Sequence, residues 1–195
     1  MTLPINLPMD LRDLGLWKSG ELNGFAIPLE RLPEPYRFFD LPSCTEVNIL
    51  EPFKKLTIQE EIERDGKTAT QKVVVGIMYR SDNKVVWDSK ILVPPDKYEE
   101  ADRWSSARYL PDYAIRHKAT VVKSERVPLQ FFTKEQIKLL KLDYESQGNP
   151  QLLLEEFVPH KDFELLYQWW KQHYKSTLRD SDNPCAVILY LTSEG

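Results

Sequence analysis

Glycine and histidine are scarce in this chain. Glycine is the main residue of common nucleotide-binding loops, and histidine is a common metal ligand. The seven glycines in 195 residues form no glycine-rich phosphate loop, which argues against a P-loop or a Rossmann dinucleotide site. The three histidines, His117, His160 and His173, have no metal-ligand spacing among themselves or with a cysteine. Since no other catalytic signature is present, we expect neither a cofactor nor a metal and favour a non-enzymatic role.

Cysteine and long apolar runs are scarce as well. Only Cys44 and Cys185 are present, and the chain is large enough to fold without a disulfide, so reduced thiols in a cytoplasmic protein are the better prediction. The longest apolar run, Ala186–Leu191, is too short to span a bilayer. Residues 1–11 lack the basic and apolar segments of a secretory signal. We therefore expect a soluble protein without a membrane contact.

Aromatic residues, by contrast, are plentiful. Five Trp, nine Tyr and eight Phe supply enough apolar surface for a substantial core. The net charge of −4 and the pI of about 5.5 give no overall attraction to nucleic acid or anionic lipid.

The first 53 residues are rich in both proline and aromatic residues. They hold half of the 14 prolines, and proline restricts regular elements to short lengths. We interpret residues 1–53 as an arm that covers the chain's own sheet or reaches a partner subunit. The candidate partner-binding residues are Trp17, Phe25, Tyr36, Phe38 and Phe39.

Residues 54–93 have the pattern of an antiparallel meander. Asp65-Gly66 and Asp82-Asn83 are residue types that tolerate the positive φ of hairpin turns. The predicted central strand, about 68–79, places one row of apolar side chains on one face: Val73, Val75, Ile77 and Tyr79. Val74 and Met78 lie on the other face, which predicts that both faces are covered.

The sequence after residue 118 predicts a strand at about 119–129, followed by helices after Thr133, after Asn149 and over residues 161–177. It also predicts a last strand over residues 185–191, inserted between other strands. Thr133 and Gln136 have the spacing of a capping box. The predicted fold class is α+β: one antiparallel β-meander sheet with two or three C-terminal helices packed on one face and a Pro-rich N-terminal arm. Residues 1–53 are the arm, and residues 54–195 the core of a single domain.

A metal-dependent nuclease or phosphodiesterase is one alternative function. It would combine Asp65 or Asp82 with Asp88 and Lys90, since carboxylates hold Mg²⁺ and a lysine steadies the developing phosphate charge. The turns already account for Asp65 and Asp82, however. The alternation around Trp87 also puts Asp88 and Lys90 on the opposite, solvated face.

Glu60 is unusual because it falls on the apolar face of its strand, between Ile58 and Ile62. Three interpretations stay open: a functional acid, an inward charge that discourages edge-to-edge association, or a bulge that changes the register.

A second alternative is binding of single-stranded nucleic acid, which uses basic side chains with interleaved aromatic residues. Trp104, Tyr109 and Tyr113 lie within the most basic run, although acidic residues dilute its charge. Its candidate residues are Arg103, Arg108, Arg116, Lys118, Lys123 and Arg126.

The favoured function is a non-catalytic protein-binding or assembly subunit, acting through the arm and an open sheet edge. Its partner would be another protein or a second copy of the chain.

Overall fold

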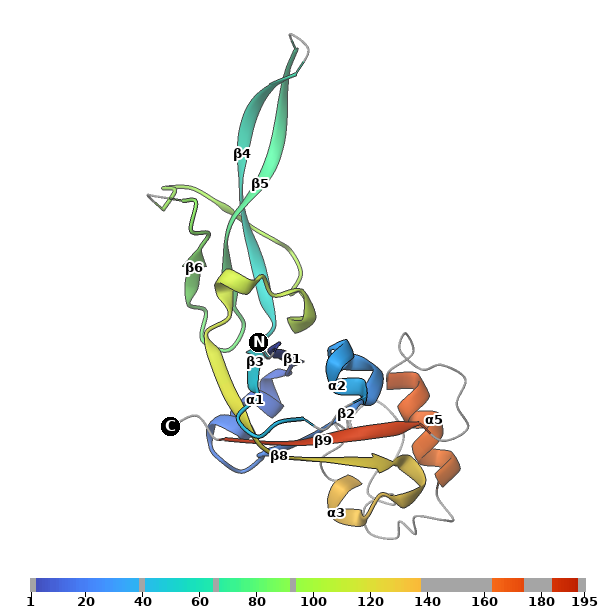
Figure 1. Cartoon of the computed structure of the whole chain (residues 1–195). Helices are drawn as coiled ribbons and strands as arrows, with labels where there is room; N and C mark the ends of the chain where they lie inside the picture. Colours follow the sequence, from blue (N-terminus) through green and yellow to red (C-terminus); the bar gives the residue numbers. More distant parts are fainter. Residues whose placement is uncertain are drawn as a thin grey trace. The chain divides into compact units, whose positions relative to one another are not determined.

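The computed structural model in Figure 1 describes residues 3–38, 41–64, 67–91, 94–137, 163–173 and 184–192. The chain divides into two compact units. One comprises Met1–Ile5, Trp17–Val47 and Ala119–Gly195, and the other comprises Asn6–Leu16 and Asn48–Lys118. Within the described residues, nine strands form two sheets, one of four and one of five strands.

The four-stranded sheet is antiparallel and has the order β6-β5-β4-β7. Its strands are β4 (Phe53–Arg64), β5 (Lys67–Tyr79), β6 (Val85–Trp87) and β7 (Glu99–Glu100). The predicted turn at Asp82-Asn83 is confirmed: Asn83 has φ 58°, and the Lys84 amide donates to Asp82 Oδ1 at 3.1 Å.

Strand β5 contains a bulge. Leu56 pairs with Gly76 and Thr57 pairs with Val74, so Val75 has no partner of its own in β4. Because directly opposed residues share a face, Val73 lies with its partner Ile58 and not with Ile77 and Tyr79. The single row predicted for Val73, Val75, Ile77 and Tyr79 is therefore wrong at Val73. The predicted position of Val74 on the opposite face is wrong for the same reason, since Val74 pairs with Thr57, which shares a face with Phe53.

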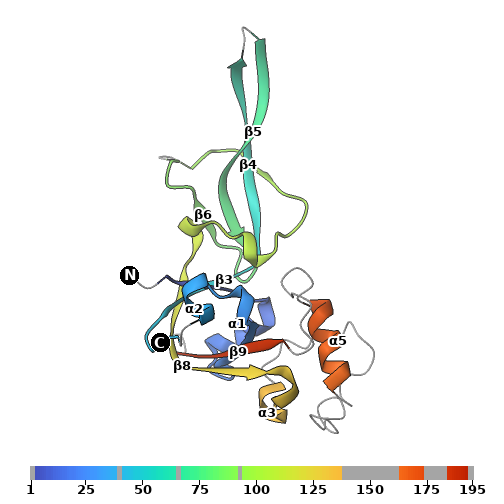
Figure 2. The ribbon, with the colours of Figure 1, turned by 45° about the vertical axis from the view of Figure 1, so that its right-hand side comes forward.

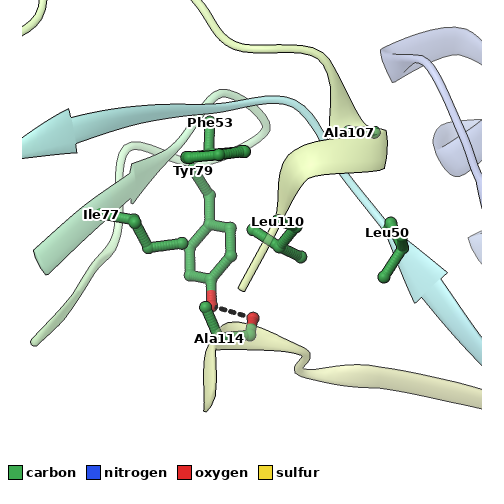
Figure 3. Packing of buried hydrophobic residues seen from close by; sticks show 7 residues of the cluster. All are labelled: Leu50, Phe53, Ile77, Tyr79, Ala107, Leu110 and Ala114. Atoms are coloured by element: carbon green, nitrogen blue, oxygen red, sulfur yellow. Dashed lines mark hydrogen bonds between the residues drawn. The ribbon is translucent and has the colours of Figure 1, made fainter. Parts of the chain in front are cut away.

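The base of the β4–β5 hairpin is covered on both faces. On one face, Phe53, Ile77 and Tyr79 are fully buried against a loop that includes the short helices η2 (Ala107–Tyr109) and η3 (Asp112–Ala114). Figure 3 shows the Tyr79 ring between Ile77 and Leu110, with its hydroxyl donating to the Ala114 carbonyl. On the other face, the Trp87 ring lies so close to Gly76 that an added Cβ would stand 2.8 Å from it.

The five-stranded sheet is mixed and curled and has the order β1-β3-β8-β9-β2. Its strands are β1 (Ile5–Pro8), β2 (Gly24–Pro28), β3 (Glu46–Leu50), β8 (His117–Pro128) and β9 (Cys185–Leu191). The last strand has the predicted bounds and lies between β8 and β2, as expected. The helices between these strands are short: α1 (Leu11–Lys18), η1 (Leu29–Arg31) and α2 (Glu34–Phe38).

At the C-terminal end the structure describes η4 (Leu129–Phe131), α3 (Lys134–Ile137) and α5 (Phe163–His173). The capping box is confirmed, since the Gln136 amide donates to Thr133 Oγ1 at 3.2 Å and the Thr133 amide to Gln136 Oε1 at 3.0 Å. Leu166 and Trp170 of α5 are buried. The helix predicted after Asn149 lies outside the described residues.

The predicted fold class is wrong. The chain builds two sheets and is mainly β, and its first 53 residues supply three strands of the second sheet instead of an arm on a single meander. The physical reason lies in the prolines. Pro8 and Pro28 each occupy the last position of a strand, where a missing amide interrupts little of the ladder. Strands this short also show too little alternation to be recognised in the sequence.

Candidate functional site

The outer part of the β4–β5 hairpin is a two-stranded ribbon with open edges. We call residues 58–64 and 67–73 the distal ribbon. β7 pairs only with Leu56 and Thr57 of β4, and β6 only with Gly76, Ile77 and Met78 of β5. Figures 1 and 2 both show the hairpin extending beyond β6. Within the described residues, no strand pairs with either edge of the distal ribbon.

The backbone of β4 offers hydrogen-bonding groups to its open edge. At the base of the strand, the Phe53 amide and carbonyl bond with Ser105, and the Lys55 carbonyl accepts from the Ala101 amide. Backbone groups alternate in direction along a strand. The N–H and C=O groups of Gln59, Glu61 and Glu63 therefore point to the same edge, beyond the end of β7.

The distal ribbon has one apolar face. Ile58 opposes Val73 and Ile62 opposes Ala69, with the pair Glu60–Gln71 between them. Ile58, Ile62 and Val73 are half-buried and Glu60 is exposed. Of the three interpretations of Glu60, the bulge is excluded, because Glu60 pairs with Gln71 and the bulge lies at Val75.

The other face of the ribbon is polar, and one of the charge pairs there, between Lys72 and Glu99, is neutralised. Lys72 Nζ lies 2.7 Å from Glu99 Oε2, and Gln59 Nε2 donates to Glu99 Oε1 at 3.0 Å. These contacts lower the pKa of Glu99, mainly through the hydrogen bond from Lys72, and raise the pKa of Lys72.

Three carboxylates along β4 have no such compensation. Glu60, Glu61 and Glu63 are exposed, and in the described part of the chain none of them forms an ion pair. Their cross-strand partners are the neutral residues Gln71, Thr70 and Thr68. The open edge of β4 is therefore acidic, next to a face that carries exposed apolar surface.

A polar cluster surrounds the buried carboxylate of Glu51 at the base of the hairpin. Glu51, whose side chain is 1% exposed, accepts from Arg116 Nε at 2.6 Å and Nη2 at 2.9 Å, and Arg116 Nη1 donates to Asp82 Oδ2 at 2.8 Å. Ser81 bridges to Glu51 Oε2 at 2.5 Å, and the guanidinium lies 3.8 Å from the Tyr79 ring centroid.

The cluster links the Glu51 carboxylate, through Arg116, to Asp82 in the turn after β5. Hydrogen bonds from Arg116 lower the pKa of Asp82, and burial raises the pKa of Tyr79 to about 12. Each nitrogen of the Arg116 side chain is engaged in holding Glu51, Ser81 or Asp82. This arrangement fixes the turn in place and leaves the guanidinium little capacity for a ligand.

The residues of the nuclease hypothesis are engaged in turns. Asp82 binds Arg116, and Asp88 Oδ1 accepts from the Lys90 amide at 2.9 Å. Lys90 is exposed, Asp88 is half-buried, and Asp65 lies outside the described residues. Among the residues that the structure describes, no three His, Cys, Asp or Glu side chains are grouped as metal ligands.

The basic residues of the nucleic-acid hypothesis are distributed over both units. Arg103, Arg108, Arg116 and Lys118 belong to one unit, and Lys123 and Arg126 to the other. Lys123 pairs with Glu125, and Arg126 donates to the carbonyls of Tyr36 and Arg37. Arg103 and Arg108 are exposed, as is Tyr109.

The aromatic residues proposed to bind a partner are mostly buried within their own unit. Trp17 is fully buried and its indole donates to the Thr192 carbonyl at 2.9 Å, and Phe25 is fully buried in β2. Tyr36 is buried and donates to the Leu3 carbonyl at 2.9 Å. Phe38 is 72% exposed, while Phe39 lies outside the described residues.

The free thiols and histidines form no site with one another in the described part of the chain. Cys44 is exposed with φ 68°, and Cys185 is half-buried at the start of β9. His117 is buried, with Nε2 3.5 Å from Glu51 Oε1. His160 lies outside the described residues, and the side chain of His173 is not among those described.

Sequence reasoning anticipated an open sheet edge but not its position. The signals that could have located it were present: three glutamates around Ile62 in β4, and no large apolar residue between Thr68 and Gln71.

No helix among the described residues is both long and apolar enough to cross a membrane. Comparisons with protein-family models, with curated proteins and with solved structures found no match.

Proposed function

We propose that this chain is a non-catalytic binding or assembly subunit that engages a protein partner through the open edge of its distal ribbon. The observation that carries the proposal is the unpaired edge of β4 beyond Thr57, where β7 ends. An added strand would continue the ladder that β7 begins, by the mode of recognition known as strand addition.

The energetics of a two-stranded ribbon support this proposal. An isolated hairpin is at best marginally stable in water, and three strands or a covering element are needed for independent stability. The distal ribbon has neither in the described residues, yet it exposes Ile58, Ile62 and Val73 in part. A partner strand would cover this surface and satisfy the outward backbone groups of β4.

The arm was the other predicted contact, and it is the weaker candidate. Trp17, Phe25 and Tyr36 contribute to the chain's own core, so engaging a partner through them would expose buried apolar surface. Phe38 is exposed and can contribute to a contact. The cytoplasmic location inferred from the two reduced cysteines stays a prediction.

The test is site-specific photocrosslinking in the cells that make this chain. A crosslinking residue replaces Thr70 in the ribbon or, as a control site, Glu34 in α2, both of which are exposed. We expect a defined protein adduct from position 70 only. A second change, Glu61→Pro, removes an amide that faces the open edge but not one that bonds to β5, and it should abolish the adduct.

The matched control is Glu61→Gln, which removes the same charge and keeps the amide. It should retain the adduct if strand addition is the mode of binding. Equal adducts at both sites, or an adduct from position 70 that survives Glu61→Pro, would contradict the proposal.

A further inference from the structure

The open edge of β4 has a charge pattern that selects its partner. We propose that it accepts a strand from another protein in which basic residues oppose Glu60, Glu61 and Glu63 and apolar residues oppose Ile58 and Ile62. This inference rests on the proposed function and deepens it, because it names the chemistry of the partner.

Among the described side chains, none compensates the acidic character of the edge where a partner strand would lie. A strand beside β4 brings its side chains to within about 5 Å of those directly opposite. Glu99 of β7, opposite Thr57, is paired with Lys72 at 2.7 Å, whereas Glu60, Glu61 and Glu63 lack an ion pair within the described residues. Basic residues in the partner strand would supply the missing counter-charges.

The same charges disfavour a second copy as the occupant. Two β4 edges in an antiparallel, twofold-symmetric pairing would oppose glutamates of one copy to glutamates of the other, which is destabilising. Charged residues on an edge strand are a common protection against such self-pairing. The three carboxylates thus exclude a like strand and attract an oppositely charged one.

The two faces of the ribbon fix the order of residues in the partner. Ile58, Glu60 and Ile62 share the apolar face, and Gln59, Glu61 and Glu63 share the polar face. β7 pairs antiparallel with β4 along this edge, so the partner is taken as antiparallel too. An antiparallel partner, read from its N-terminal end, would face Glu63 first and Ile58 last. Its six residues would therefore be basic, apolar, basic, basic, polar and apolar.

The experiment uses the full chain and two labelled peptides that differ only in charge. One carries the sequence Lys-Val-Lys-Lys-Thr-Val between Gly-Ser flanks, and the other replaces each Lys with Glu. Binding is measured by fluorescence anisotropy at low and high salt, and ¹H–¹⁵N spectra locate the contact. We expect the lysine peptide alone to bind, more weakly at high salt, with shifts concentrated in residues 58–64.

Two variants separate strand addition from charge selection. Glu61→Pro should abolish binding of the lysine peptide. The triple variant Glu60→Gln, Glu61→Gln, Glu63→Gln keeps every amide and should weaken binding about tenfold, which is about 1.4 kcal/mol shared among three exposed charge pairs. Circular dichroism and thermal unfolding establish that both variants are folded.

The outcomes discriminate the two proposals. Equal affinity for both peptides, or an unchanged affinity in the triple variant, would overturn the basic partner and leave strand addition standing. Binding of neither peptide would overturn the inference, while the crosslinking result decides the proposed function separately. Concentration-dependent oligomers of the chain that Glu61→Pro disrupts would identify a second copy as the occupant and overturn it too.

Discussion

The two ends of the β4–β5 hairpin share one ladder but differ in what surrounds them. At the base, Phe53, Ile77 and Tyr79 are fully buried on one face, and Trp87 covers Gly76 on the other. In the distal ribbon, pairing continues through Arg64 and Lys67, yet its apolar residues stay partly exposed. Continuous hydrogen bonding therefore does not mean uniform stability, because burial differs along the same two strands.

The sharpest test of this difference compares two isoleucines of one hairpin. Ile77→Ala should lower the free energy of unfolding by about 3 kcal/mol, since it leaves a cavity in a closed core. Ile62→Ala removes the same atoms from the half-exposed ribbon and should cost less than about 1 kcal/mol. Urea denaturation measures both. Equal losses would show that the ribbon is as well buried as the base.

The cluster around the buried Glu51 should make the base of the hairpin sensitive to single changes of charge. Arg116→Met leaves Glu51 buried beside Ser81 without its cation, and we expect a loss of about 2 kcal/mol, reduced from the value for a fully buried pair because Arg116 is 22% exposed. Adding Glu51→Met removes the uncompensated charge and should restore much of that loss. Strictly additive effects in this double-mutant cycle would contradict direct coupling.

The same cluster predicts how the base responds to acid. Asp82 has a folded-state pKa below its usual value because Arg116 donates hydrogen bonds to it. Its contribution to stability is thus complete above the unfolded pKa of about 4 and is lost as the pH falls through the lower folded pKa. Asp82→Asn should reduce the difference in urea midpoint between about pH 7 and about pH 3. An unchanged difference would show that other carboxylates dominate.

The smallest effect is expected from the ion pair of the ribbon. Lys72 and Glu99 are solvent-exposed in spite of their 2.7 Å contact, and exposed pairs contribute little to stability. Lys72→Met should leave the midpoint of thermal unfolding unchanged. A clear drop would show that this pair holds the ribbon in place, and would weaken the contrast with the base.

Local structure could be predicted from the sequence wherever the residue types at a few neighbouring positions determine it. Asp82-Asn83 marked a turn because Asn tolerates positive φ. Thr133 and Gln136 marked a helix start through their reciprocal bonds. The uninterrupted apolar run of β9 marked a strand buried between two others.

The remainder depended on contacts between distant residues. The bulge at Val75 could not be predicted from the sequence, because it depends on which residues of β4 pair with Gly76 and Val74. Arg116 meets Glu51 across 65 positions of sequence, and β7 is two glutamates that become a strand only by lying beside β4. The open edge was foreseeable in kind, but its extent is set by where β7 ends.

The alternation of faces also constrains how the ribbon can change in length. Because side chains alternate with a period of two, a deletion in one strand alone carries every residue beyond it to the opposite face. Loss of Glu61 alone would place Ile62 opposite Thr70 on the polar face, whereas loss of two adjacent opposed pairs would preserve the pattern. Evolutionary variants of this hairpin should therefore be shorter or longer by even numbers of residues in each strand, balanced between the two.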